Sequence, residues 1–236
     1  TGIGIPGSLS PKTNLVRNAN STWLIGKPLK QDLKKILKRD VSIENDANCF
    51  AISEAFDGAG SKAHTVFGVI LGTGVGAGIV IGKKIHTGKN KIAGEWGHNP
   101  LPWAHEGELP GKKCYCGRSG CLETFISGPA IEREFKNLQG RNLNMKNIVE
   151  ESGAGNLKAE QVIRNLEDRL ARALAHVINI LDPDSIILGG GLSNIDRLYS
   201  NVPKIWAKYI FSDDVSTVLS KARFGDSSGV RGAAWL

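Results

Sequence analysis

Three cysteines and one histidine form the group of residues with the clearest chemical use. Cys114, Cys116 and Cys121 fall in one short segment, and His98 precedes them. Thiolates and imidazoles are the ligands that tetrahedral Zn²⁺ prefers, and four protein ligands leave no open position on the metal. The sequence therefore predicts a structural zinc site, which this crowding favours over three unrelated buried cysteines. Cys49 stands in an apolar helical stretch and is expected to be a small core residue.

Carboxylates stand near this segment and at an expected helix start. Asp46 lies between two amides in the run Glu44–Asn48. An N-cap accounts for this pattern by itself, but a carboxylate held ionised at a helix N-terminus and turned toward a cleft is also a suitable general base. Glu95 and Glu123 bracket the proposed zinc segment, so ligation by His98 would fix the positions of both. Ordinary surface acids are the alternative for these two, disfavoured for Glu95 by the glycines that flank it.

A glycine-rich run, Gly72–Gly78, offers backbone N–H groups and one hydroxyl to a phosphate. A glycine-rich hairpin without a ligand explains the run equally well. A dinucleotide fingerprint requires a helix directly after the glycines, whereas β-branched residues continue as a strand here. The dinucleotide-binding interpretation is therefore rejected.

The spacing of apolar residues predicts the helices and strands that would position these side chains. The pattern alternates between strands and helices, which indicates an α/β protein. Strands are expected at residues 1–5, before a turn at Pro6-Gly7, and at 41–43, 66–71, 77–81 and 185–188, and helices at 29–39, 46–56, 162–181 and 195–211. The 66–71 and 77–81 strands should form a hairpin around the glycines.

Composition narrows the class of protein. The chain has 236 residues, 41% of them hydrophobic, and a formal net charge of +7. The lysines are spread without interleaved aromatic residues, so a solvated basic surface is favoured over a nucleic-acid site. No run is long and apolar enough for a membrane helix, no secretion signal is recognised, and the cysteines suit a reducing compartment. We expect a soluble, cytoplasmic protein.

Taken together, these motifs resemble the ROK family (repressors, open reading frames, kinases) of actin-like sugar kinases. The resemblance extends over nearly the whole chain. It rests on Gly2–Gly7, Glu44–Asn48, Leu71–Gly78, Gly94–His98, the Cys-x-Cys-Gly-x-x-Gly-Cys segment, Asp182–Gly191 and Gly225–Ala234. It implies a ribonuclease-H-like (actin-like ATPase) α/β fold with two lobes and a cleft. The lobes are expected at 1–61 and 62–224, with 225–236 returning to the first lobe.

The resemblance also implies a role for each matching residue. Asp46 matches the family's catalytic base, and His98 matches both a zinc ligand and a sugar-binding position. The other positions that match sugar-binding residues are Asn20, Asn45, Glu95 and Glu123. The second phosphate loop matches Gly72, Thr73 and Gly74, and the adenosine-side motif matches Gly189, Gly190 and Gly191. ATP, Mg²⁺ and a structural Zn²⁺ are the implied cofactors, and a homodimer is the implied assembly.

Within the family, three stretches are most similar to bacterial fructokinases that also act on mannose. They are Asn18–Leu24, Glu95–Trp103 and Cys121–Gly128. The sequence therefore predicts ATP-dependent phosphorylation of a hexose primary hydroxyl, with fructose as the first candidate. An N-acetylglucosamine kinase or a glucokinase is the alternative within the enzymes.

Two interpretations from other classes stay open. They are a sugar-sensing ROK repressor and a zinc-stabilised carbohydrate-binding module without activity. The family's opening motif, Asp-x-Gly-Gly-Thr-Lys, has no counterpart in this sequence. We therefore expect a preceding segment that completes the first lobe.

Overall fold

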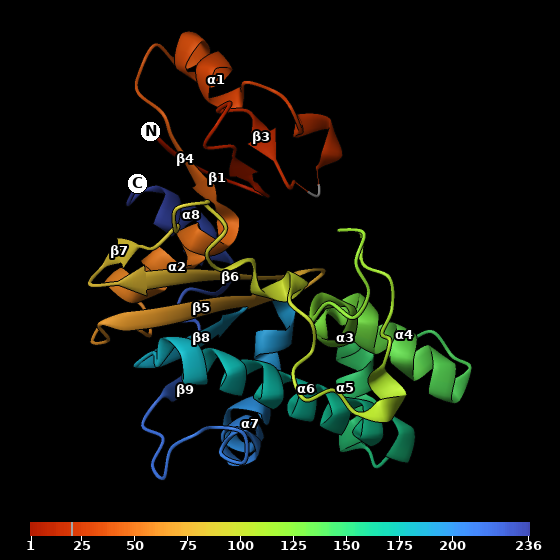
Figure 1. Cartoon of the computed structure of the whole chain (residues 1–236). Coiled ribbons are helices and arrows are strands. Elements are labelled where there is room, and N and C mark those ends of the chain that lie inside the picture. The colour runs from red at the N-terminus through yellow and green to blue at the C-terminus, as the bar shows by residue number, and fades with distance from the viewer. Residues whose placement is uncertain (20) are drawn as a thin grey trace.

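A five-stranded mixed sheet forms the centre of the molecule (Figure 1). The computed structural model describes residues 1–19 and 21–236. The strand order is β7-β6-β5-β8-β9, where β5 (Thr65–Leu71) pairs antiparallel with β6 (Val75–Ile81) and parallel with β8 (Ser185–Gly189). The edges are β7 (Lys84–Ile85), antiparallel to β6, and β9 (Val218–Lys221), parallel to β8.

Both faces of this sheet are covered by helices, and the alternation of strand residues decides which face each side chain joins. Ile186 and Leu188 of β8 join the main core, whereas Ile187 between them joins a second core on the opposite face. The main core is covered by α4 (Gly128–Gln139), α5 (Met145–Gly153), α6 (Leu157–Leu181) and α7 (Leu198–Trp206), and the short α3 (Glu123–Ile126) precedes α4. The opposite face carries α2 (Asp46–Phe56), and α8 (Ser228–Ala233) packs against α2, as Figure 1 shows.

A smaller part of the chain lies beyond α2 and α8. Here β1 (Gly2–Ile5) pairs parallel with β4 (Ser42–Asn45), β2 (Ser8–Leu9) pairs antiparallel with β3 (Val16–Arg17), and α1 (Leu29–Leu37) lies outermost. The last helix, α8, contacts both α2 and β1. Helix α2 contacts β4 of the smaller part as well as β5 and β6 of the large sheet, so it belongs to both by its contacts. The predicted boundary between two lobes at residue 61 therefore stays a prediction.

Most of the expected elements are confirmed. The helix at 46–56 begins and ends where the sequence predicted, and the hairpin forms around the glycines. The helix expected at 195–211 is shorter, because a 3₁₀ turn at Gly191–Asn194 precedes α7 and the helix ends at Trp206. In α1 the periodicity identified the helix but not its burial, since Ile36 is 75% exposed.

No helix in the described part of the chain is both long enough and apolar enough to cross a membrane.

Candidate functional site

The predicted metal ligands lie together. His98 Nδ1 is 3.5 Å from Cys114 Sγ, and Cys116 Sγ is 3.6 Å from Cys121 Sγ. All four candidate ligand atoms lie within 4.8 Å of one another. A tetrahedral zinc with metal–sulfur bonds of about 2.3 Å separates two of its sulfur atoms by about 3.8 Å. The spacing of these side chains therefore fits a closed zinc shell.

Backbone pairing holds this segment in place. The Cys114 N–H donates to Arg118 O at 2.8 Å, and the Gly117 N–H donates to Cys114 O at 3.0 Å. A β-bridge joins Pro100 to Cys121, which brings the chain after His98 beside the last cysteine. The turn is therefore shaped by hydrogen bonds that do not involve the metal ligands' side chains.

The predicted residues Glu95 and His98 lie in one 3₁₀ turn, Glu95–His98. Gly94 and Gly97 allow this turn to lie against β6. A Cβ atom on Gly94 would lie 2.1 Å from Ala77 O, and one on Gly97 would lie 2.0 Å from Val75 O. Both distances are far below van der Waals contact. Only glycine permits this close approach, which fixes where Glu95 and His98 stand.

Asp46 is the first residue of α2, and its neighbour Asn45 caps the helix. Asn45 Oδ1 accepts from the Ala47 N–H at 2.9 Å, while Asn45 Nδ2 donates to Gly7 O at 3.1 Å. The Ala47 N–H also donates to Asp46 Oδ1 at 2.8 Å, so both side chains accept at the start of the helix. The surrounding chain withdraws Asp46 from bulk water, and this desolvation raises the pKa of its carboxyl, although hydrogen bonds from Ala47 and Asn45 oppose the shift.

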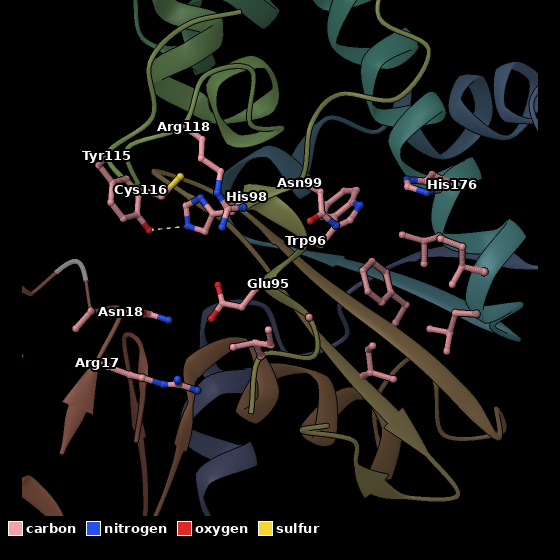
Figure 2. A pocket seen from close by; sticks show the side chains of 18 of the residues that line it. Arg17, Asn18, Glu95, Trp96, His98, Asn99, Tyr115, Cys116, Arg118 and His176 are labelled. Atoms are coloured by element: carbon pink, nitrogen blue, oxygen red, sulfur yellow. Dashed lines mark hydrogen bonds between the residues drawn. The ribbon is translucent and has the colours of Figure 1, made fainter. Parts of the chain in front are cut away.

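Adjoining cavities connect these side chains. Asn45, Asp46 and Glu95 line a small cavity of about 60 Å³. Glu95 also lines a cavity of about 830 Å³ together with His98 (Figure 2). Burial raises the pKa of Glu95, and the carboxylates of Asp46 and Glu123 add to this effect, while His98 and Arg17 oppose it. The three carboxylates thus share one electrostatic environment.

Glu123 is the first residue of α3 and closely follows the Cys114–Cys121 segment, here called the metal segment. Its side chain contacts the glycine-rich turn. Its Oε2 accepts from the Val75 N–H at 3.0 Å, and a Cβ on Gly74 would lie 2.8 Å from the same oxygen. Glu123 and Thr73 line a third cavity of about 540 Å³. Glu123 therefore stands between the metal segment and the predicted phosphate loop.

The two predicted nucleotide segments lie at the carboxyl ends of neighbouring parallel strands. Gly72, Thr73 and Gly74 form the turn between β5 and β6, and Gly189, Gly190 and Gly191 end β8 and begin the next turn. Ile70 pairs with Gly189, and a Cβ on Gly190 would lie 2.5 Å from Leu71 O. Ligands of open α/β sheets bind at such strand ends.

Two residues of this region were not predicted from the sequence. Arg17 and Tyr115 line the large cavity, and Arg17 Nη2 donates to Asn90 O at 2.6 Å, which joins β3 to the segment before Glu95. An aromatic residue between two cysteines was the only available signal for Tyr115, and no signal distinguished Arg17. Asn20 lies outside the described residues.

Comparison with known proteins identifies the family of the chain. The sequence pattern of the ROK family matches residues 1–236. N-acetyl-D-glucosamine kinases of Vibrio cholerae and Yersinia pseudotuberculosis are 41% and 40% identical to the chain, covering all of it and 79% of each relative.

Solved structures share the fold. A ROK hexokinase from Thermus thermophilus matches with a TM-score of 0.86 and 29% identity over 99% of this chain and 76% of its own. A ROK glucokinase from Streptomyces griseus, in complex with glucose and AMPPNP, matches with a TM-score of 0.84 and 29% identity over 99% and 79%. With its α/β, actin-like fold, the chain belongs to the ROK family.

Proposed function

We propose that the chain transfers the γ-phosphoryl group of ATP to the primary hydroxyl of a hexose, with Asp46 as the general base. Kinase activity is supported by membership of the family and by relatives that are sugar kinases. The observation that carries the assignment of the base is that Asp46 and Glu95 share one cavity, which adjoins the cavity of His98.

In the proposed reaction the Asp46 carboxylate accepts the proton of the sugar's primary hydroxyl, whose oxygen attacks the γ-phosphorus. The bond from the γ-phosphorus to the bridging oxygen breaks, and ADP leaves. Phosphoryl transfer needs little covalent chemistry from a protein, so positioning and charge neutralisation supply most of the catalysis.

The remaining predicted residues would position the substrates. Glu95, His98 and Glu123 would hold sugar hydroxyls. Asn45 would position Asp46, because its side chain caps α2 and donates to Gly7 O. The glycine segments would face ATP, whose phosphates carry Mg²⁺. The Cys₃His group would hold a structural zinc that fixes His98 and Glu123.

The relatives and the sequence stretches favour different sugars. The relatives named above are N-acetyl-D-glucosamine kinases, which supports the alternative given by the sequence analysis and lends no specific support to fructose. A ROK transcriptional regulator also shares the fold, at 25% identity and a TM-score of 0.81. The predicted homodimer and the absence of a nucleic-acid partner stay predictions.

An ADP-release assay with fructose, mannose, glucose and N-acetylglucosamine tests the proposal. We expect sugar-dependent ADP release by the natural full-length protein. In Asp46→Asn turnover should fall by about 10² to 10⁴, while sugar affinity changes little. Sugar binding without ADP release by the unsubstituted protein would favour a sensor, and undiminished turnover in Asp46→Asn would exclude Asp46 as the base.

A further inference from the structure

Arg17 links the smaller part of the chain to a loop of the larger part. It lies on β3, and its Nη2 donates to Asn90 O at 2.6 Å and to Lys91 O at 3.5 Å. Its Nε donates to Ser8 Oγ at 3.4 Å, which orients the guanidinium. The two acceptors belong to the loop at residues 86–94, which connects β7 to the next 3₁₀ turn. One side chain thus bonds to both the smaller and the larger part.

The tip of this loop has few other hydrogen bonds. The ends of the loop are bonded to β6 through the backbone of His86 and Gly94. Between these ends, the hydrogen bonds that the structure describes for residues 88–92 join the tip to itself, to the Glu95 N–H that follows the loop, and to Arg17. Of these partners, Arg17 alone comes from another part of the chain. Its side chain extends from β3 into the cavity that also holds Glu95 (Figure 2).

The loop and Ser8 also form walls of the small cavity that contains Asp46. Thr87 and Lys91 line this cavity from the loop, and Ser8 lines it from the smaller part. Because Arg17 bonds to Ser8 and to the backbone of Lys91, it holds these two walls together. Burial also raises the pKa of the Asp46 carboxyl, as expected where such walls keep bulk water away.

We propose that Arg17 is a positioning residue of the kinase, which holds the loop at residues 86–94 against the smaller part and so closes the cavity of Asp46 against water. This inference rests on the proposed function. A guanidinium that donates to a carbonyl oxygen forms a charge-assisted hydrogen bond, which is stronger than one between neutral groups. Because the loop leads directly into Glu95, the same bonds also fix the position of this predicted sugar-binding residue.

Exclusion of water decides which nucleophile receives the phosphoryl group. A water molecule at Asp46 would lose a proton to this carboxylate and attack the γ-phosphorus. The bond to the bridging oxygen would then break, and ADP and inorganic phosphate would be released in place of ADP and a sugar phosphate. A closed site prevents this side reaction. Arg17 therefore favours transfer to the sugar over transfer to water.

The ratio of ADP released to sugar phosphate formed tests this in the natural full-length protein. We expect a ratio of about one for the unsubstituted protein, and of about two or more for Arg17→Ala, because its cavity admits water. In the same variant kcat/KM for the sugar should fall by about tenfold to a hundredfold, because Glu95 is placed less precisely. Arg39→Ala, a change at an exposed arginine of the smaller part, should leave both quantities unchanged.

Arg17→Lys separates the role of the charged donor from a general effect on the fold. The lysine keeps a charged donor for the loop but cannot also reproduce the fork that bonds to Ser8, so the ratio of ADP to sugar phosphate should lie between those of the unsubstituted protein and Arg17→Ala. Melting temperatures identify any variant that has lost the fold.

An Arg17→Ala protein that melts normally and releases one ADP for each sugar phosphate would overturn the proposal, even if kcat/KM falls. If Arg17→Ala does not fold, a ratio of one in folded Arg17→Lys would overturn it. Transfer to no sugar by the unsubstituted protein would instead refute the proposed function on which this role rests.

Discussion

Asp46 combines two properties that a general base requires. It is fixed at the first turn of α2, beside the capping Asn45, and it faces a cavity that it shares with Glu95. Desolvation raises the pKa of its carboxyl, which brings this pKa closer to neutral pH than that of a solvated aspartate. A base is more effective when its pKa approaches the working pH.

The raised pKa predicts the acid limb of the pH profile. A carboxylate accepts a proton only when it is ionised, so if Asp46 is the base, kcat/KM should fall as the pH is lowered through the pKa of Asp46. Because burial raises this pKa, the midpoint should lie above the value of about 3.9 for a solvated aspartate. A profile of kcat/KM with a saturating excess of ATP measures it.

Glu95→Gln supplies the control for this profile, because burial raises the pKa of Glu95 as well. Overall activity should decrease, but the acid limb should persist with the same midpoint or a slightly lower one, since one neighbouring negative charge is removed. Disappearance of the limb in Glu95→Gln would assign the titration to Glu95.

At the scale of elements, the metal segment predicts a dependence of stability on metal. Cys116→Ala removes one of the four ligands that lie within 4.8 Å of one another. Metal-binding energy is part of the folding energy at such sites, so the variant should lose zinc and its melting temperature should fall by at least about 5 °C. Elemental analysis and calorimetry measure both quantities. Cys49→Ala, a change at a buried cysteine outside the group, should keep the metal, and a full zinc content in Cys116→Ala would contradict the ligand assignment.

A buried ion network anchors the segment between His98 and Cys114. Arg172 on α6 is fully buried, and its Nη2 lies 2.9 Å from both carboxylate oxygens of Glu108. Arg172 Nη1 also donates to Pro102 O and Trp103 O, at 3.1 and 3.0 Å. Burial disfavours ionisation of Glu108, but hydrogen bonds from Arg172 and then Arg169 outweigh it and lower the pKa to about 2.

This network predicts stability that depends on pH. The pKa of Glu108 is about 2 in the folded chain and about 4.3 for an unfolded glutamate. The stabilisation is therefore complete above about pH 5 and is lost as the pH falls toward 2. Glu108→Gln should reduce the free energy of unfolding at pH 7 by about 1.5 to 3 kcal/mol, and the deficit should shrink on acidification.

Urea denaturation at a series of pH values measures this deficit. Glu106→Gln alters an exposed carboxylate in the same turn and should have little effect at any pH. A deficit in Glu108→Gln that stays constant down to pH 2 would mean that the ion pairs contribute nothing.

At the scale of the whole molecule, one buried carboxylate joins distant parts of the chain. Glu54 of α2 accepts from the Ser228 hydroxyl at 2.7 Å and from the Arg223 N–H at 3.0 Å. It also accepts from the Ala59 N–H at 2.9 Å. The helix that carries Asp46 is thereby fixed to the turn that leads into α8, where the chain returns to β1.

Removal of this carboxylate should loosen the whole molecule. Glu54→Ala leaves the buried Ser228 hydroxyl and part-buried backbone N–H groups without their acceptor, and a buried donor without a partner costs about 1 to 3 kcal/mol. We expect the free energy of unfolding to fall by at least about 3 kcal/mol, measured by urea denaturation. Asp213→Ala, a change at an exposed carboxylate, is the matched control. Equal stability of the two variants would show that Glu54 does not hold α2 to the C-terminal segment.

Local sequence determined much of this protein. The α2 boundaries followed from capping residues and apolar spacing, and the β5–β6 hairpin followed from two β-branched runs around glycines. The Cys₃His group was recognisable because its three cysteines are close in sequence and thiolates have a narrow range of chemical uses. These are short-range relations that a linear pattern records.

Tertiary structure alone decided the arrangement that bears on function. Asp46, Glu95 and Glu123 are far apart in sequence, and their common environment arises because α2 packs on β6 while glycines bring the Glu95–His98 turn against the same strand. The contact of Tyr115 with His98 and the burial of Arg172 among carboxylates and carbonyls have no periodic signature. A sequence pattern reports which residues share an element, whereas the distance between elements depends on how their faces pack.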